Sequence, residues 1–151
     1  MTCCFTGHRS IPPYWIEQLQ KNLDKTLLDL IDQGVTKFIC GGALGFDTLA
    51  AQAVIKQKQD NPNIFLTLAL PCRDQAKRWN SIQKLVYEDI LSSADEIIYL
   101  FDHYVTGCMH ARDKFMVDSS DIVIAYYRGK NGGTQYTFKY AEEQKKKIIL
   151  L

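Results

Sequence analysis

Short runs of β-branched and aromatic residues alternate along the chain with longer stretches of helical periodicity, and this alternation most constrains the fold. The expected strands cover Thr2–Thr6, Lys37–Cys40, Ile64–Leu70, Glu96–Phe101, Ile122–Tyr127 and Lys147–Leu151. The third run is apolar throughout, as expected of a strand with helices over both of its sides. Regular strand–helix alternation predicts an α/β protein with a doubly wound, mainly parallel sheet of about six strands and helices on both faces.

The stretches between these runs are expected to form five helices. In the first, Leu19, Leu23, Leu27 and Leu30 fall on one face and Gly34 ends the helix. In the second, the apolar period runs through residues 44–54 and is broken at residues 60–63. The remaining helices are expected at Gln75–Ser93, with Trp79, Ile82, Val86 and Ile90 on its inner face, at His110–Asp118 and at Gln135–Lys146. The length of 151 residues suits one domain, so residues 1–151 are interpreted as a single domain.

Composition limits the classes of partner. The formal net charge is +1, so the whole chain has no general attraction for nucleic acids or anionic membranes, and neither is expected as a partner. The five cysteines include no Cys-x-x-Cys pair, which favours a reducing compartment and argues against a disulfide scaffold or a metal site. No apolar run reaches the roughly 20 residues of a membrane helix, and no basic leader precedes the first strand. A cytoplasmic location is therefore expected.

Glycine-rich segments follow two of the expected strands and lead directly into helices. The first contains Gly41, Gly42 and Gly45, and the second contains Gly132 and Gly133. In an open α/β sheet, ligands bind beyond the carboxyl ends of the strands. A helix start offers unpaired N–H groups and partial positive charge to a phosphate. Neither segment matches the G-x-G-x-x-G or G-x-x-x-x-G-K-[ST] fingerprint, so a standard dehydrogenase or P-loop enzyme is not expected.

Other residues that follow the strands are candidate ligand contacts, each with a structural alternative. Arginine pairs bidentately with phosphate, and Arg9, Arg73 and Arg112 all lie on the expected ligand side, where a surface ion pair is the alternative. Asp47 either suits the first turn of a helix or accepts hydrogen bonds from ribose hydroxyls. Trp79 either stacks on a base through its indole ring or belongs to the core. The last candidates, which lie in the first loop or at a helix start, are Gly7, His8, Thr134 and Gln135.

These loops resemble the YpsA-like branch of the SLOG superfamily. The resemblance rests on the segments 2–9, 41–47, 70–73 and 118–121, and on Gly132–Tyr136, and it extends over essentially the whole chain. It implies a Rossmann-like domain that binds nucleotides or nucleotide-derived ligands such as ADP-ribose or NAD. It is compatible with a homodimer and leaves any protein partner unidentified. The superfamily also contains the DNA-processing protein DprA and the LOG phosphoribohydrolases.

The resemblance carries over unevenly to individual residues. Gly7 with Arg9, and Gly45 with Asp47, look like the first-loop pair and the helix start of DprA. Arg112 looks like the arginine of the LOG enzymes and is the one candidate catalytic residue, but Thr137 occupies the position of their glutamate. A threonine lacks the carboxylate that would activate water. We therefore expect a nucleotide-binding sensor or regulatory module without a resident cofactor. The alternatives are a nucleotide N-glycosidase and a DprA-like single-stranded DNA binder.

Overall fold

Six parallel strands form one sheet in the computed structural model, which describes all residues from 1 to 151. The strand order is β4-β3-β2-β1-β5-β6. The strands are β1 (Thr2–Gly7), β2 (Lys37–Cys40), β3 (Phe65–Cys72), β4 (Glu96–Phe101), β5 (Ile122–Tyr126) and β6 (Lys147–Leu150). The predicted doubly wound sheet of six strands is confirmed, with bounds shifted by one or two residues.

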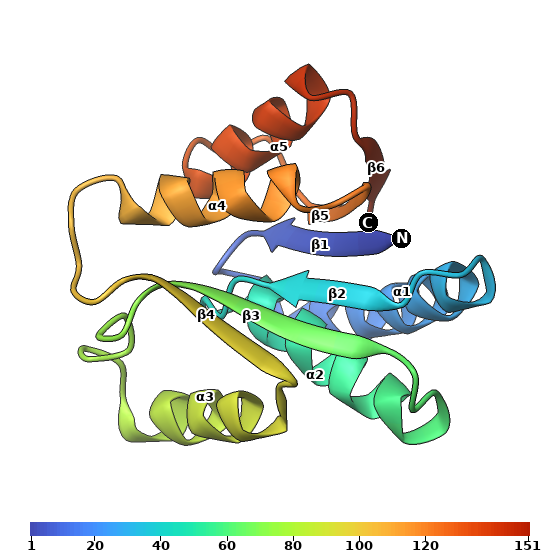
Figure 1. Cartoon of the computed structure of the whole chain (residues 1–151), viewed down its shortest axis with the longest axis horizontal. Helices are drawn as coiled ribbons and strands as arrows, with labels where there is room; N and C mark the ends of the chain where they lie inside the picture. The colour runs from blue at the N-terminus through green and yellow to red at the C-terminus, as the bar shows by residue number, and fades with distance from the viewer.

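Five helices cover the two faces of this sheet (Figure 1). Helices α1 (Pro13–Asp32), α2 (Phe46–Asp60) and α3 (Ser81–Ser93) lie on one side, and α4 (Cys108–Asp118) and α5 (Gly133–Glu143) lie on the other. The larger core lies under the first three helices and includes Phe5, Phe38 and Phe46. The smaller core joins Met116 and Val117 of α4 to the opposite side of the central strands. None of the helices has both the length and the apolar character needed to cross a membrane.

Helix α1 forms as its leucine pattern predicts. Leu19, Leu23, Leu27 and Leu30 are all buried against the sheet. Pro13 opens the helix, where its missing N–H group costs nothing. At the other end, Gly34 adopts a φ of 95°, in the left-handed region that glycine occupies without strain.

Helix α3 is shorter than predicted. Residues after β3 form turns instead, in which Lys77 N–H donates to the Asp74 carbonyl and Trp79 N–H donates to the Ala76 carbonyl. The helix begins after Asn80, which accepts a hydrogen bond from Gln83 N–H while the Gln83 side chain accepts one from Asn80 N–H. Such a capping box fixes the start of a helix.

The predicted inner face of α3 was therefore partly wrong. Ile82 is 74% exposed, and Trp79 lies outside the helix. The buried residues of α3 are Tyr87 and Ile90. Trp79 precedes the capping box and so falls outside the helix, and Ile82 lies in the first turn, where its side chain is exposed.

The strand order places a topological switch beside β1. The chain passes from β1 outward through β2 and β3 to β4, then returns across the sheet through α4 to β5 on the other side of β1. The loops that follow β1 and β5 consequently leave the sheet in diverging directions. A crevice opens at such a point in doubly wound sheets, and ligands bind there.

Candidate functional site

A cavity of about 360 Å³ lies at the carboxyl ends of β1 and β5, at the switch point. Four parts of the chain build its walls: the end of β1 and its loop, the start of α2, the first turns of α4 and the segment that leads into α5. The lining residues are Phe5, Thr6, Gly7, His8, Arg9, Ala43, Asp47, Met109, His110, Arg112, Asp113, Asn131, Gly132, Gly133 and Thr134. Only three of the fifteen are hydrophobic, so the cavity suits a polar ligand.

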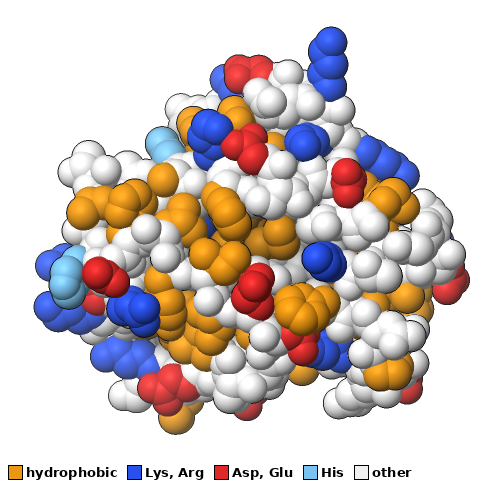
Figure 2. Space-filling view, viewed as in Figure 1, with side chains coloured by type: hydrophobic (Ala, Val, Ile, Leu, Met, Phe, Trp, Pro, Cys, Tyr) orange, Lys and Arg blue, Asp and Glu red, His pale blue; other side chains and the backbone are white.

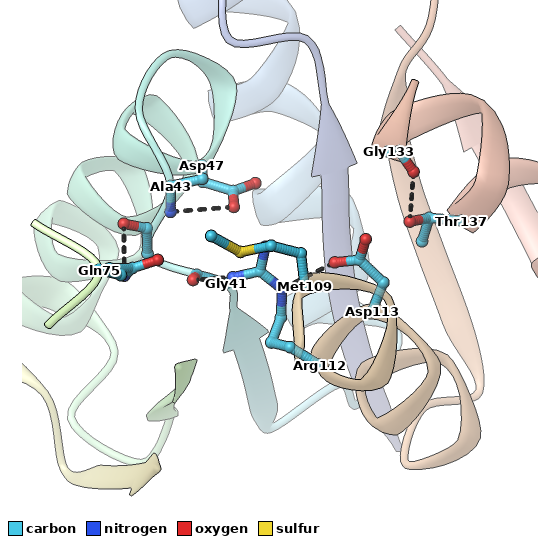
Figure 3. Close-up of polar contacts among 10 residues, drawn as sticks. Gly41, Ala43, Asp47, Gln75, Met109, Arg112, Asp113, Gly133 and Thr137 are labelled. Atoms are coloured by element: carbon cyan, nitrogen blue, oxygen red, sulfur yellow. Dashed lines mark hydrogen bonds and ion pairs between the residues drawn. The ribbon is translucent and has the colours of Figure 1, made fainter. Parts of the chain in front are cut away.

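A buried guanidinium group forms the floor of the cavity (Figure 3). Arg112 projects from α4 and is only 5% exposed. Its Nε donates to Asp113 Oδ1 at 2.7 Å, and its Nη1 donates to the carbonyl oxygen of Gly41. A buried guanidinium needs both a counter-charge and hydrogen-bond acceptors, and these two contacts supply them. Arg112 is thus engaged by the protein itself.

Asp47 lies in the first turn of α2, on a different side of this guanidinium from Asp113 (Figure 3). Its Oδ2 accepts a hydrogen bond from Ala43 N–H at 3.2 Å, and its side chain forms no ion pair within 4 Å. Burial raises the pKa of Asp47 to about 6; Arg112 opposes this change and Asp113 adds to it. Asp47 therefore changes its charge close to neutral pH. Two carboxyl groups flank one guanidinium, which gives the floor an acidic character.

The start of α5 forms an electropositive wall beside the Asp113 carboxylate, since a Cβ atom on Gly133 would lie 3.8 Å from Asp113 Oδ2. The first hydrogen bond of this helix is donated by Tyr136 N–H to the Gly132 carbonyl at 3.1 Å. The N–H groups of Gly133, Thr134 and Gln135 therefore have no acceptor within the helix. Gly132 has a φ of 137°, which turns the chain into the helix with open space around its Cα. Free N–H groups and the helix dipole together favour an anion here.

His8 connects the β1 loop to the segment after β5. Its Nε2 accepts a hydrogen bond from Arg128 N–H at 2.8 Å, so the other ring nitrogen carries the proton in the neutral form. Partial burial lowers the pKa of His8, and the charges of Lys130 and Arg128 lower it further. Neutral His8 thus holds the segment that carries Gly132 and Gly133 against the β1 loop.

The structure brings together eight of the residues proposed from the sequence. Gly7, His8, Arg9, Asp47, Arg112, Gly132, Gly133 and Thr134 all line the one cavity. Six others lie outside it, and three of these are the glycines after β2. Arg73 pairs with Asp102 at 3.4 Å on the surface, Trp79 lines a separate groove, and Gln135 is in α5 but not in the cavity wall.

The glycines after β2 serve packing, and Gly41, Gly42 and Gly45 do not line the cavity. A Cβ atom on Gly41 would lie 2.8 Å from Arg112 Nη1 and from Asp47 Oδ2, so the glycine lets this network form. Gly45 has a φ of 77°, and a Cβ there would lie 2.2 Å from the Arg9 carbonyl oxygen. Ala43 of this segment does line the cavity, but its N–H group donates to Asp47, so the N–H groups that remain free come from the segment before α5.

The cavity also contains residues that the sequence did not single out as ligand contacts, among them Asp113, Met109, His110 and Asn131. Asp113 follows Arg112 directly, and a carboxylate beside a candidate arginine was a readable signal. The His110 ring stacks on Tyr136, with ring centres 4.1 Å apart and planes at 10°. This contact joins α4 to α5, and the residues around His110 and Tyr136 in the sequence do not predict it.

Comparison with known proteins agrees with this architecture. Residues 13–149 match the model of the YpsA family, described as the YspA SLOG family. The chain belongs to the YpsA SLOG family. The SPbeta prophage-derived protein YoqJ of Bacillus subtilis (strain 168) is 36% identical over 138 residues, which cover 80% of this chain and 81% of YoqJ. The UPF0398 protein BH1768 of Halalkalibacterium halodurans is 30% identical over 132 residues, covering 85% of this chain and 70% of that protein.

A solved structure shares the fold at lower sequence identity. DNA processing protein A from Helicobacter pylori superposes with a TM-score of 0.70 at 18% identity. The match covers 99% of this chain and 64% of that protein, so the chain spans somewhat less than two thirds of its length. At this identity the likeness establishes the Rossmann-like α/β fold of this YpsA family member and nothing finer.

Proposed function

We propose that this protein binds a nucleotide or nucleotide-derived phosphate in the cavity between β1 and β5 and acts as a sensor or regulatory module. The observation that carries the proposal is the opposed polarity of the cavity. Free backbone N–H groups at Gly133 and Thr134 form one wall, and the carboxyl groups of Asp47 and Asp113 lie at the floor. A phosphate fits the first and the hydroxyl groups of a sugar fit the second.

The charges of the cavity support a sugar phosphate over a simple anion. Arg112 is already paired with Asp113 and donates to Gly41, so its charge is balanced within the floor. Arg9 is exposed at the rim and remains available for a phosphate oxygen. A hydrogen bond to a charged group contributes roughly 1.5–3 kcal/mol, so a few N–H groups and one arginine suffice for affinities below millimolar.

A charge substitution at the start of α5 tests this proposal. Thr134→Asp adds a negative charge where the helix dipole favours one, so the fold is kept while an anionic ligand is repelled. Thr134→Asn is the matched neutral control. Isothermal titration of AMP, ADP-ribose, NAD and cyclic nucleotides is expected to show binding by the wild type and the Asn variant. Thr134→Asp is expected to weaken it by about tenfold or more. Equal affinity in both variants, or no binding of any ligand below millimolar, contradicts the proposal.

Hydrolysis of an N-glycosidic bond is a second candidate, favoured by the two carboxyl groups. Thr137 does not supply an acid, because its Oγ1 donates to the Gly133 carbonyl at 2.8 Å within α5. Asp47, whose pKa lies near 6, is suited to hold or release a proton near neutral pH. In this reaction, water would replace the base at the sugar carbon, and the base would leave with a proton. Chromatography of AMP or NAD incubated with wild type and Asp47→Asn tests it, and the absence of free base at high enzyme concentration excludes it.

Binding of single-stranded DNA is a third candidate, favoured by the fold of the Helicobacter pylori protein, whose single-stranded DNA binding is known. Exposed Arg73, Lys77 and Arg78 follow β3. Figure 2 shows Lys and Arg side chains gathered at its left edge, toward which the arrows of β1 and β2 point in Figure 1. Cationic grooves are the usual basis of such binding. A gel shift at low salt, lost in the triple alanine variant of these residues, would support this candidate; no shift would exclude it.

A further inference from the structure

A second hollow lies on the other side of the β1 loop. This groove has a volume of about 470 Å³ and is bounded by the start of α1, the start of α2 and α3. These three helices cover the same face of the sheet (Figure 1). Eight of its thirteen lining residues are hydrophobic, among them Ile11, Ile16, Leu44, Leu49, Trp79 and Val86. The groove is therefore the apolar counterpart of the polar cavity.

Arg9 connects the two hollows. It lines both of them, and it is the one charged residue in the wall of the groove. Its backbone rests on Gly45, the glycine that allows this close approach. The Arg9 side chain is exposed. A ligand that passes over Arg9 can thus place an anionic part in the cavity and an apolar part in the groove.

The groove has the chemistry that receives an aromatic ring. Trp79 is half-buried in its wall and meets Tyr87 edge to face, with ring centres 5.1 Å apart and planes at 73°. Aromatic and aliphatic walls bind the faces of bases without requiring one particular base. Ser10, Thr48 and Gln83 add hydrogen-bonding groups for the ring nitrogens and exocyclic groups. A few polar groups in an apolar wall are typical of small-molecule sites.

We propose that this groove binds the aromatic base of the nucleotide whose phosphate lies in the cavity, with Arg9 between the two parts. The inference rests on the proposed function, since it assumes that a phosphate occupies the cavity. It narrows the ligand class, because a bare sugar phosphate leaves the groove empty. The single charge at the junction suits an anionic ligand with an apolar ring.

The two tryptophans of the chain allow a direct optical test. Trp15 carries a buried Nε1–H group without a hydrogen-bond partner, so Trp15→Phe removes an unsatisfied donor and leaves Trp79 as the sole tryptophan. In this variant, AMP is expected to change the emission of Trp79, whereas ribose 5-phosphate leaves the emission unchanged. Calorimetry is expected to show that both ligands bind, AMP about tenfold more tightly, as one stacked base contributes.

Adjacent residues of α3 provide a matched pair of variants. Val86 lines the groove, whereas Leu85 is 66% exposed and does not. Val86→Phe narrows the groove and is expected to reduce the affinity for AMP to that of ribose 5-phosphate, with ribose 5-phosphate binding unchanged. Leu85→Phe, which adds the same ring on the exposed side, is expected to change neither.

The outcomes separate the two proposals. If neither AMP nor ribose 5-phosphate binds, the proposed function fails, and the groove proposal fails with it. If ribose 5-phosphate binds, AMP binds no more tightly and AMP does not change the emission of Trp79, the groove proposal is overturned while the proposed function stands. An AMP affinity that survives Val86→Phe in a folded protein also overturns it.

Discussion

The buried carboxyl group of Asp47 makes a sharp prediction about stability and pH. In the folded protein its pKa is about 6, compared with an ordinary value of 3.8. Between these values the folded state binds more protons than the unfolded chain, so the free energy of unfolding falls as the pH rises. This difference in pKa corresponds to about 3 kcal/mol, which is a large part of the stability of a small domain.

Asp47→Asn isolates this contribution. Asparagine keeps an oxygen that accepts the hydrogen bond from Ala43 N–H but has no charge to lose. The unfolding free energy of the variant minus that of the wild type is expected to rise by about 3 kcal/mol from about pH 3 to about pH 8. Urea denaturation at a series of pH values, without ligand, measures this difference, and a carbon-13 titration of the Asp47 carboxyl group measures the pKa directly.

The refuting result is equally specific. A difference in stability that stays constant would mean that folding leaves the pKa of Asp47 unchanged, with the charge of Arg112 offsetting the burial. A difference that falls with rising pH would mean that ionised Asp47 is favoured in the folded protein, with the charge of Arg112 outweighing the burial. The geometry argues otherwise, because Arg112 Nε donates to Asp113 and its Nη1 donates to Gly41.

Three further predictions concern stability alone, each measured by urea denaturation at fixed pH. Arg112→Leu leaves Asp113, which is 14% exposed, without its buried partner and is expected to cost about 3–5 kcal/mol. Arg73→Ala breaks an exposed pair and is expected to cost less than about 1 kcal/mol; equal costs would refute the distinction. Leu27→Ala removes a fully buried side chain and is expected to cost about 2–5 kcal/mol, against about 0.5 kcal/mol or less for Leu28→Ala, whose side chain is 46% exposed. Asn80→Ala removes the capping box of α3 and is expected to cost about 1 kcal/mol; no loss would show that packing alone sets the start of that helix.

The fold could be predicted from local patterns, because the spacing of apolar residues that marks a strand or a helix is a property of a short segment. The leucine period of α1 and the apolar run of β3 each identify their element without reference to the rest of the chain. The third helix begins later than predicted because a capping box, and not the apolar period, sets its first residue. The spacing of Asn80 and Gln83 carried the correct start.

The site was harder to predict from the sequence than the fold, because its contacts join segments that are far apart in the chain. Position in the chain places Arg9, Asp47 and Arg112 at the same sheet edge, and the structure brings them to one cavity. That Gly41 accommodates Arg112, 71 residues away, depends on how α4 crosses the sheet. A glycine that permits packing and a glycine that binds phosphate look alike in sequence.

The central place of β1 has a consequence for synthesis on the ribosome. β1 precedes the other five strands of the sheet along the chain, yet one of its two neighbours in the sheet, β5, begins at residue 122. A nascent chain that lacks β5 leaves one edge of β1 bare, a surface prone to pairing with other chains. The cavity forms only after residue 134 has been added, so it is completed after five of the six strands of the sheet have been made.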